Sequence, residues 1–226
     1  MNRKFSIAYK ILTVLALFTG IVLNLIKTTS AISLLSYYTL QSNIICLIAF
    51  ICYSINEIRD KSGSYRKSDI YYLVKGALII MIFITTFFYH IALSPFGFNM
   101  DLNHKDLIIK KIANFFVHSI SPVLVILDYF FFDEKGKFKM YYPFLWLFLP
   151  FNYVMYVYFY ASLGGTFFGV GGSKQFAYFF LDYIELGILS VIKWLIIMAL
   201  VILLISYILI IIDRILKKRK RTKRKS

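Results

Sequence analysis

Six long apolar runs constrain this chain more than any other feature of its sequence. A helix needs about 20 residues to cross the roughly 30 Å hydrocarbon layer of a bilayer, and each run has that length. The runs cover residues 5–26, 33–55, 71–93, 108–132, 141–162 and 187–212. Since 60% of the 226 residues are hydrophobic, the chain is too apolar for a soluble domain with one buried core. We therefore predict an all-α polytopic membrane protein with six transmembrane helices.

Lysine and arginine give the expected orientation of these spans. One set of predicted loops and ends carries 18 of them, nine in residues 214–226, whereas the other set carries five. This asymmetry predicts that both termini are cytoplasmic. We expect a transmembrane domain over residues 1–213 and a basic tail over 214–226. The tail is expected to contact anionic lipid, and no motif points to a nucleic-acid partner.

The second run contains polar side chains that share one helical face. Thr39, Ser42, Asn43 and Cys46 follow the i, i+3, i+4, i+7 spacing of a stripe, whereas Gln41 lies to one side. Small polar residues at such positions often join helices by close packing and hydrogen bonds. The stripe therefore predicts either a helix–helix contact or one wall of a functional site.

The fourth run places His118 inside an apolar segment, followed by Ser121, Pro122 and Asp128. An ionisable side chain at membrane depth indicates a functional site, although a hydrogen-bonded core histidine is the structural alternative. Pro122 has no N–H, so the carbonyl of His118 loses its usual helical partner and a kink is expected.

The predicted depths bring the second and fourth runs to one level. Thr39 is expected about 9 Å and His118 about 15 Å below the outer ends of their helices. A hydroxyl and an imidazole together can act as a nucleophile and its base. A weaker alternative is a Zn²⁺ site formed by His90, His104 and His118, whose even spacing of 14 residues matches no compact metal motif. No cofactor is expected.

Four short motifs give the chain a family resemblance. They are "YYTLQSN" in the second run, "HSISPVLVILDYFFF" in the fourth, "YYPFLW" at the start of the fifth and "FFLDYIELG" before the sixth. In order and spacing they resemble a group of predicted six-span bacterial membrane proteins. That group is distantly related to the androgen-induced membrane hydrolases, which cleave fatty-acid esters of hydroxy fatty acids.

The resemblance implies an activity, a site and a location. Thr39 would be the nucleophile, His118 the general base, and a lipid-like ester the substrate, in a bacterial cell membrane. The chain departs from the pattern after the fifth run. It reads "ASLGGT" over residues 161–166, where relatives tend to have Arg-Gly.

The leading hypothesis is therefore an intramembrane Thr/His ester hydrolase that works through an acyl-enzyme. Ser42, Asn43 and Ser121 are candidates to stabilise the oxyanion or orient the histidine, and Asp128 is a further supporting residue. The alternatives are a small-molecule binding or transport protein, and a structural membrane protein without catalysis. The glycine-rich loop at 163–186 is expected to be a lid or an interfacial connector.

Overall fold

Six membrane-length helices make up most of the structure. This computed structural model describes residues 3–26, 28, 30–60, 67–93, 105–169 and 172–222 and is 84% helical. The helices long and apolar enough to cross a membrane are Arg3–Ile26, Tyr38–Arg59, Asp69–Ile91, Ile108–Phe132, Tyr142–Ser162 and Ile188–Lys218. They coincide with the six predicted runs, so the prediction of an all-α polytopic membrane protein is confirmed.

Shorter elements divide or connect these spans. In chain order the elements are α1 (Arg3–Ile26), α2 (Ala31–Leu35), α3 (Tyr38–Arg59), α4 (Asp69–Phe88), the π-helical turn η1 (Tyr89–Leu93), α6 (Lys105–Phe115), the π-helical turn η2 (Phe116–Ile120), α7 (Ser121–Phe132), α8 (Tyr142–Trp146), α9 (Phe148–Ser162), β1 (Phe167–Gly169), β2 (Gly172–Lys174), the 3-10 turn η3 (Phe179–Leu181), α10 (Tyr183–Leu186) and α11 (Ile188–Thr222).

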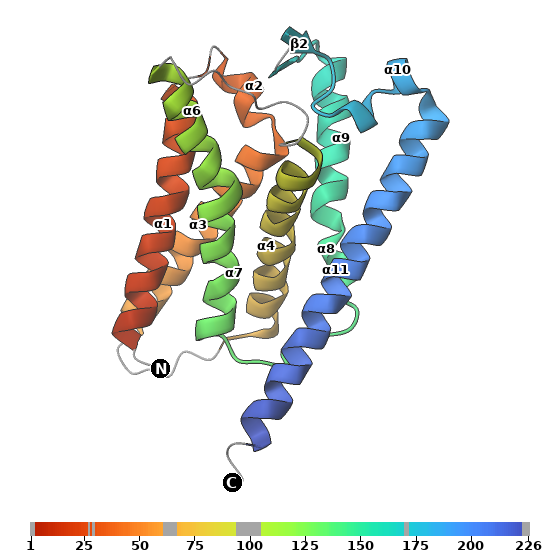
Figure 1. Ribbon diagram of the computed structural model, residues 1–226. Coiled ribbons are helices and arrows are strands. Elements are labelled where there is room, and N and C mark those ends of the chain that lie inside the picture. The colour runs from red at the N-terminus through yellow and green to blue at the C-terminus, as the bar shows by residue number, and fades with distance from the viewer. Residues whose placement is uncertain are drawn as a thin grey trace.

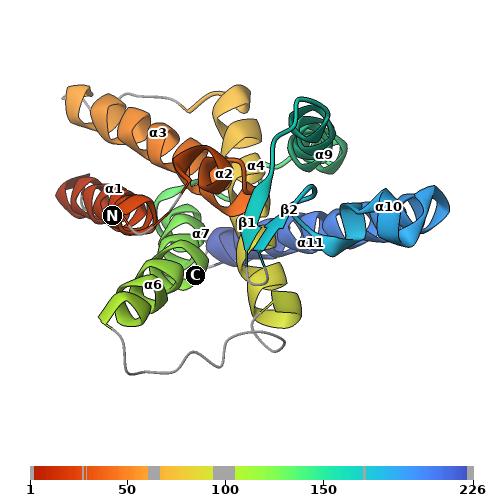
Figure 2. The ribbon, with the colours of Figure 1, turned by 90° about the horizontal axis from the view of Figure 1, so that it is seen from above.

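The long helices run side by side, and both termini lie at the same end of the bundle (Figure 1). We call this end the basic end, because α11 carries lysines and arginines beyond Asp213 there. The opposite end, which carries β1, β2, α2 and α10, is called the hairpin end. Viewed from the hairpin end, α11 extends outward from the other helices (Figure 2).

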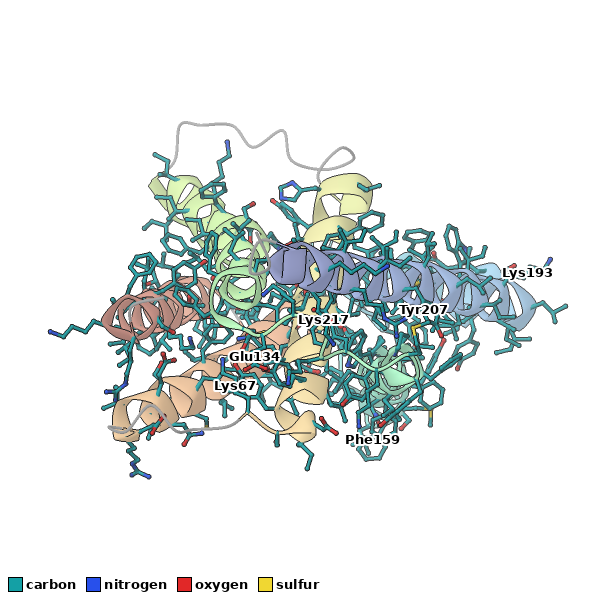
Figure 3. The ribbon with its side chains drawn as sticks, turned by 90° about the horizontal axis from the view of Figure 1, so that it is seen from below. Lys67, Glu134, Phe159, Lys193, Tyr207 and Lys217 are labelled. Carbon is teal, nitrogen blue, oxygen red and sulfur yellow. The ribbon has the colours of Figure 1, made fainter. Side chains whose placement is uncertain are left out.

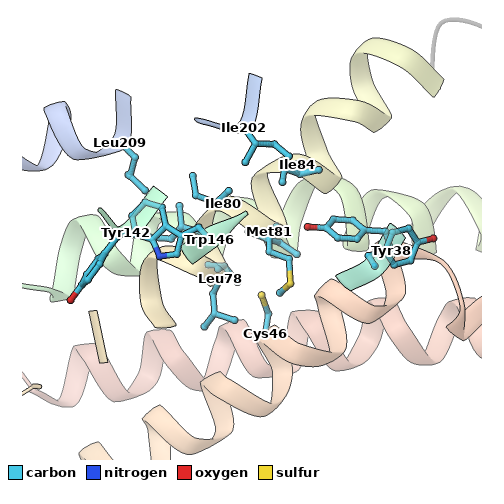
Figure 4. Packing of buried hydrophobic residues seen from close by; sticks show 14 of the residues in the cluster. Tyr38, Cys46, Leu78, Ile80, Met81, Ile84, Tyr142, Trp146, Ile202 and Leu209 are labelled. Atoms are coloured by element: carbon cyan, nitrogen blue, oxygen red, sulfur yellow. The ribbon is translucent and has the colours of Figure 1, made fainter. Parts of the chain in front are cut away.

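Close contacts at two glycines set the packing of the bundle. A Cβ atom on Gly20 would lie 2.9 Å from Val117 Cγ1, so α1 packs tightly against η2. A Cβ on Gly76 would overlap the Trp146 ring, which seats α8 against α4. Figure 4 shows the core beside this contact, with Cys46 facing Met81 and with Ile202 of α11 next to Ile84. The four helices α1, α3, α4 and α7 thus surround the buried polar groups described below.

The loop after α9 folds back over the hairpin end of the bundle. β1 and β2 form an antiparallel hairpin in which Phe167 pairs with Lys174. Phe167 is buried, and the Phe168 N–H donates to Ser33 Oγ of α2 at 2.8 Å. The Tyr37 hydroxyl donates to the Phe168 carbonyl at 3.1 Å. These contacts hold the hairpin over the beginning of α3.

At the basic end, Asp213 joins α11 to the rest of the bundle. Its buried carboxylate accepts hydrogen bonds from the Tyr129 hydroxyl and from the backbone N–H groups of Gly136 and Phe138. Figure 3, seen from this end, places Lys217 and Glu134 near the middle of the view and Lys193 far along α11. α11 continues past the boundary expected at residue 213 as far as Thr222, because lysine and arginine favour the helix there.

Candidate functional site

The polar stripe of α3 faces α4 and η2. Ser42 Oγ donates to the carbonyl of Thr39 at 2.9 Å and shares a 2.9 Å hydrogen bond with Thr85 Oγ1 of α4. Asn43 Nδ2 donates to the carbonyl of Thr39 at 2.8 Å and to that of Val117 in η2 at 3.2 Å. One side chain therefore bridges the backbone at Thr39 and the backbone next to His118.

His118 lies on a π-helical turn whose cause is in the sequence. Pro122 cannot donate to the His118 carbonyl, and the helix widens by one residue so that the Ser121 N–H donates to the Phe116 carbonyl. The distortion expected at Pro122 is thus a π-helical turn. Such turns often occur at functional sites. His118 is 7% exposed, so the widened turn holds its imidazole inside the bundle.

A second π-helical turn meets the first. η1 carries Tyr89, whose ring stacks on the His118 ring with centroids 3.8 Å apart and planes 10° apart. The next residue, His90, pairs its Nε2 with Ser119 Oγ at 3.1 Å. The His118 ring also interacts with the backbone at Thr85. These contacts fix the plane of the imidazole between α4 and α7.

Three buried polar atoms around His118 have no hydrogen-bond partner in the described part of the chain. They are Asn43 Oδ1, His118 Nδ1 and Ser121 Oγ. Buried polar atoms are nearly always satisfied, and each exception calls for an explanation. Because Asn43 contacts η2 and Ser121 directly follows it, all three atoms belong to one region. We call Thr39, Ser42, Asn43, His118 and Ser121 the His118 cluster.

Thr39 is half-buried at the edge of this cluster. Both candidate catalytic residues are described, and no hydrogen bond joins Thr39 Oγ to His118. Asn43 links the two segments through the backbone carbonyls of Thr39 and Val117. The Thr39 side chain interacts instead with the phenol of Tyr178, in the segment that follows the hairpin. Burial raises the pKa of Tyr178, so its hydroxyl keeps its proton at neutral pH.

Comparisons with protein-family models, with curated proteins and with solved structures found no match. The roles of Thr39 as nucleophile and His118 as base therefore stay predictions, and the geometry of the site supplies the arguments for them.

The three-histidine alternative concerns residues that the structure describes only in part. His104 lies outside the described residues. Among the residues that are described, no group of three His, Cys, Asp or Glu side chains is placed to hold a metal ion. His90 pairs with Ser119, and His118 stacks on Tyr89, so both imidazoles have other contacts.

Asp128 belongs to a separate cluster, about three helical turns from His118 towards the basic end. Its carboxylate pairs with Lys75 of α4 and, at 3.2 Å, with Lys10 of α1. Lys10 also pairs with Glu57 of α3 at 3.0 Å. Asp128, Lys75 and Lys10 are all at most 1% exposed. Asp128 is therefore a partner of two lysines, and the supporting role expected for it at His118 stays a prediction.

We call Lys10, Glu57, Lys75, Asp128 and Asp133 the ionic cluster. It continues to the surface at the basic end. Asp133 Oδ1 accepts from Lys67 Nζ at 2.5 Å and from the Tyr71 hydroxyl at 2.9 Å, and its other oxygen lies 3.7 Å from Lys75 Nζ. Sequence reasoning placed Lys10 and Lys75 inside spans but did not pair them with Asp128. Their pairing with an acid could have been expected from the sequence, because charged side chains at membrane depth nearly always pair with one another.

Proposed function

We propose that the protein is an intramembrane hydrolase of a lipid-like ester, with Thr39 as nucleophile and His118 as general base. The observation that carries the proposal is the buried imidazole of His118, whose Nδ1 has no partner in the described chain. It is held on a π-helical turn, and Asn43 hydrogen-bonds both the Thr39 carbonyl and the carbonyl of Val117, the residue before His118. A base needs such a free lone pair close to the proton that it removes.

The proposed reaction has two steps. In the first, His118 Nδ1 takes the Thr39 hydroxyl proton, Oγ forms a bond to the ester carbonyl carbon, and the carbon–oxygen bond to the alcohol breaks. The protonated imidazole gives its proton to the departing alkoxide, which leaves as the alcohol. In the second, His118 takes a proton from water, the hydroxide attacks the acyl-enzyme, and the fatty acid leaves as the proton returns to Thr39 Oγ.

The supporting residues differ in whether their hydrogen-bond donors already have partners. The Asn43 amide N–H groups and the Ser42 hydroxyl are engaged with backbone carbonyls or with Thr85, so these residues position α3 against α4 and η2. The Ser121 hydroxyl is buried without a partner in the part of the chain that is described, which leaves it free to donate to the oxyanion. The Tyr178 phenol lies beside Thr39 and interacts with its side chain.

The test is hydrolysis of a fluorogenic medium-chain acyl ester by the detergent-purified protein. Thr39→Ala and His118→Gln are each expected to lower kcat by at least about 100-fold, since a general base contributes about 10²–10⁴. Thr13→Ala is the matched control, because Thr13 is a buried threonine of α1 whose hydroxyl bonds only the Tyr9 carbonyl. Hydrolysis that persists in folded Thr39→Ala contradicts the proposal. No hydrolysis in the wild type rejects it for this ester class, and a purely structural protein then becomes the better reading.

A second candidate function is transport of a small molecule, which the ionic cluster favours. A transporter needs polar groups in both halves of the membrane. The His118 cluster lies towards the hairpin end, and the Lys10–Asp128–Lys75 group lies towards the basic end. Solute flux into vesicles that contain the protein, lost on Asp128→Asn but retained by Thr39→Ala, would favour transport over hydrolysis.

We further propose that the protein resides in a bacterial cell membrane and contacts anionic lipid through its basic C-terminal segment. The observation that supports this is the unbroken helix α11, which carries basic residues beyond Asp213 at the basic end. Anionic lipid attracts such segments by about 1 kcal/mol for each basic residue near the surface.

A further inference from the structure

A crevice between α3, α4 and α9 opens beside the His118 cluster. It encloses about 210 Å³. Besides three tyrosines, it is lined by Gln41, Ser42 and Ile45 of α3, Met81 of α4, and Leu149 and Asn152 of α9. Ser42 belongs to both sites, since it lines the crevice while its hydroxyl bonds Thr85 and the Thr39 carbonyl. The crevice therefore adjoins the residue proposed as nucleophile.

The three tyrosines of the crevice differ in what their hydroxyls do. The Tyr153 hydroxyl donates to the Ser36 carbonyl at 3.3 Å, and the Tyr156 hydroxyl shares a 2.7 Å hydrogen bond with Ser36 Oγ. These two tie α9 to the end of α2. Tyr38 is 8% exposed, and its hydroxyl has no partner among the described residues. One of the residues that line the crevice, Tyr38, thus has a buried phenol without a hydrogen-bond partner in the described chain.

Two amides in the crevice lie where lipid is expected. Asn152 is exposed near the middle of its span, and its Nδ2 donates to the Phe148 carbonyl at 2.7 Å, which leaves its amide oxygen available. The Gln41 amide is half-buried and has no hydrogen-bond partner within the described chain. Polar groups that face hydrocarbon are costly unless they are satisfied, so these amides point to an occupant that can hydrogen-bond.

We propose that this crevice binds one hydrocarbon chain that carries a neutral hydrogen-bonding group, and that Tyr38, Gln41 and Asn152 recognise the group. Ile45, Met81 and Leu149 supply apolar contacts, and no lining side chain is charged, which favours a hydroxyl or ester over a carboxylate. The volume is below the roughly 300–1,000 Å³ of drug-sized pockets and suits part of a single chain. The inference rests on the proposed function, because the chain is then that of the ester held beside Thr39.

The experiment uses ligands without an ester, so that binding is measured apart from hydrolysis. The full-length protein in lipid nanodiscs is photolabelled with a long-chain fatty alcohol that bears a diazirine in mid-chain, and the labelled residues are mapped by mass spectrometry. A long-chain secondary alcohol and the alkane of the same length then compete for labelling. We expect labels on residues 38–45 and 149–156, and about two- to tenfold stronger competition by the alcohol, the effect of one or two hydrogen bonds.

Substitutions identify the residues that discriminate between these competitors. Gln41→Leu and Asn152→Leu are expected to abolish the preference for the secondary alcohol. Asn24→Leu is the matched control, because the Asn24 amide donates to its i−4 carbonyl, that of Gly20, at 2.8 Å, as Asn152 does to Phe148, but lies on α1 away from the crevice. The control is expected to keep the preference.

Three results would overturn the proposal. They are labels spread evenly over all lipid-facing helices, equal competition by alkane and alcohol in the wild type, and a wild-type oligomer that Gln41→Leu or Asn152→Leu dissociates. The last would show that a second copy of the chain covers the amides. Photolabelling of Thr39→Ala separates this inference from the proposed function. A preference kept in that variant, with no ester hydrolysed by the wild type, supports the crevice and rejects the hydrolase.

Discussion

The His118 cluster and the ionic cluster around Asp128 share α3, α4 and the α6–α7 span, yet their polar groups are satisfied to different degrees. Asp128 is held by two lysines, and the charges extend through Asp133 to the surface. The two buried carboxylate oxygens that make no hydrogen bond there, Asp128 Oδ1 and Asp133 Oδ2, still lie 3.2 Å and 3.7 Å from a lysine Nζ. Around His118, by contrast, three buried polar atoms have no partner in the described part of the molecule. A paired set of charges holds helices together, whereas unpaired donors and acceptors can still bind a ligand.

The backbone also differs between the two regions: it is regular in the ionic cluster and distorted at His118. Asp128 and Lys75 lie on regular α-helix, where a side chain occupies its position with no disturbance of the main chain. His118 and His90 lie on π-helical turns, which are rarer and often mark functional sites. The basic end thus combines paired charges with regular helix, whereas the hairpin end combines unpartnered polar atoms with π-helical turns.

The largest expected effect is that of Asp128→Asn, which leaves Lys75 and Lys10 without their shared carboxylate. Breaking a buried ion pair by removal of one partner costs about 3–5 kcal/mol. The free energy of unfolding in mixed micelles measures the loss. Asp69→Asn is the control, because Asp69 pairs with Lys139 at the exposed surface, and no measurable change is expected there. Equal losses of stability in the two variants would contradict the claim that the buried ion pairs hold the helices together.

Removal of both Asp128 and Lys75 should lower the free energy of unfolding less than removal of Asp128 alone. In Asp128→Leu with Lys75→Met, Lys10 keeps Glu57 as a partner and the lost charges are replaced by apolar groups. We expect a coupling energy of about 1–3 kcal/mol between the two positions in a double-mutant cycle. Additive effects would show that Asp128 and Lys75 do not depend on each other.

The smallest change in stability is expected for Ser121→Ala in the His118 cluster. Removal of a buried hydroxyl without a partner should leave the free energy of unfolding unchanged or raise it by up to about 1 kcal/mol. If Ser121 donates to the oxyanion, kcat for the fluorogenic ester falls by about 10²–10³ in the same variant. A stability loss larger than 1 kcal/mol with full activity would make Ser121 a structural residue.

The spans could be predicted from the sequence because their signal is local. Each is an apolar run of about 20 residues, and no tertiary contact is needed to recognise it. Pro122 likewise predicted a distortion at His118, since the missing N–H acts on its own helix. The partners that the widened turn meets, Gly20 of α1 and Tyr89 of η1, lie far from it in the sequence and could not be predicted.

The pairing of polar groups could not be predicted, because it depends on how the helices are rotated about their axes. Lys10, Lys75 and Asp128 are each visible as charges within apolar runs, but only the packing of α1, α4 and α7 brings them together. For the same reason the predicted depths of Thr39 and His118 could not reveal that Asn43 bonds the carbonyls of Thr39 and Val117. The crevice beside α9 is formed by residues of three helices, so no local sequence pattern could have predicted it.

The ionic cluster also has a consequence for the synthesis of the protein. Lys10 enters the membrane with the first helix, long before Asp128 has been translated. Until α3 brings Glu57, the Lys10 side chain must reach the aqueous boundary by extending along α1. Lys75 enters with the third span and meets Asp128 only when the fourth span has been made, so the order of translation sets the order in which these buried ion pairs can close.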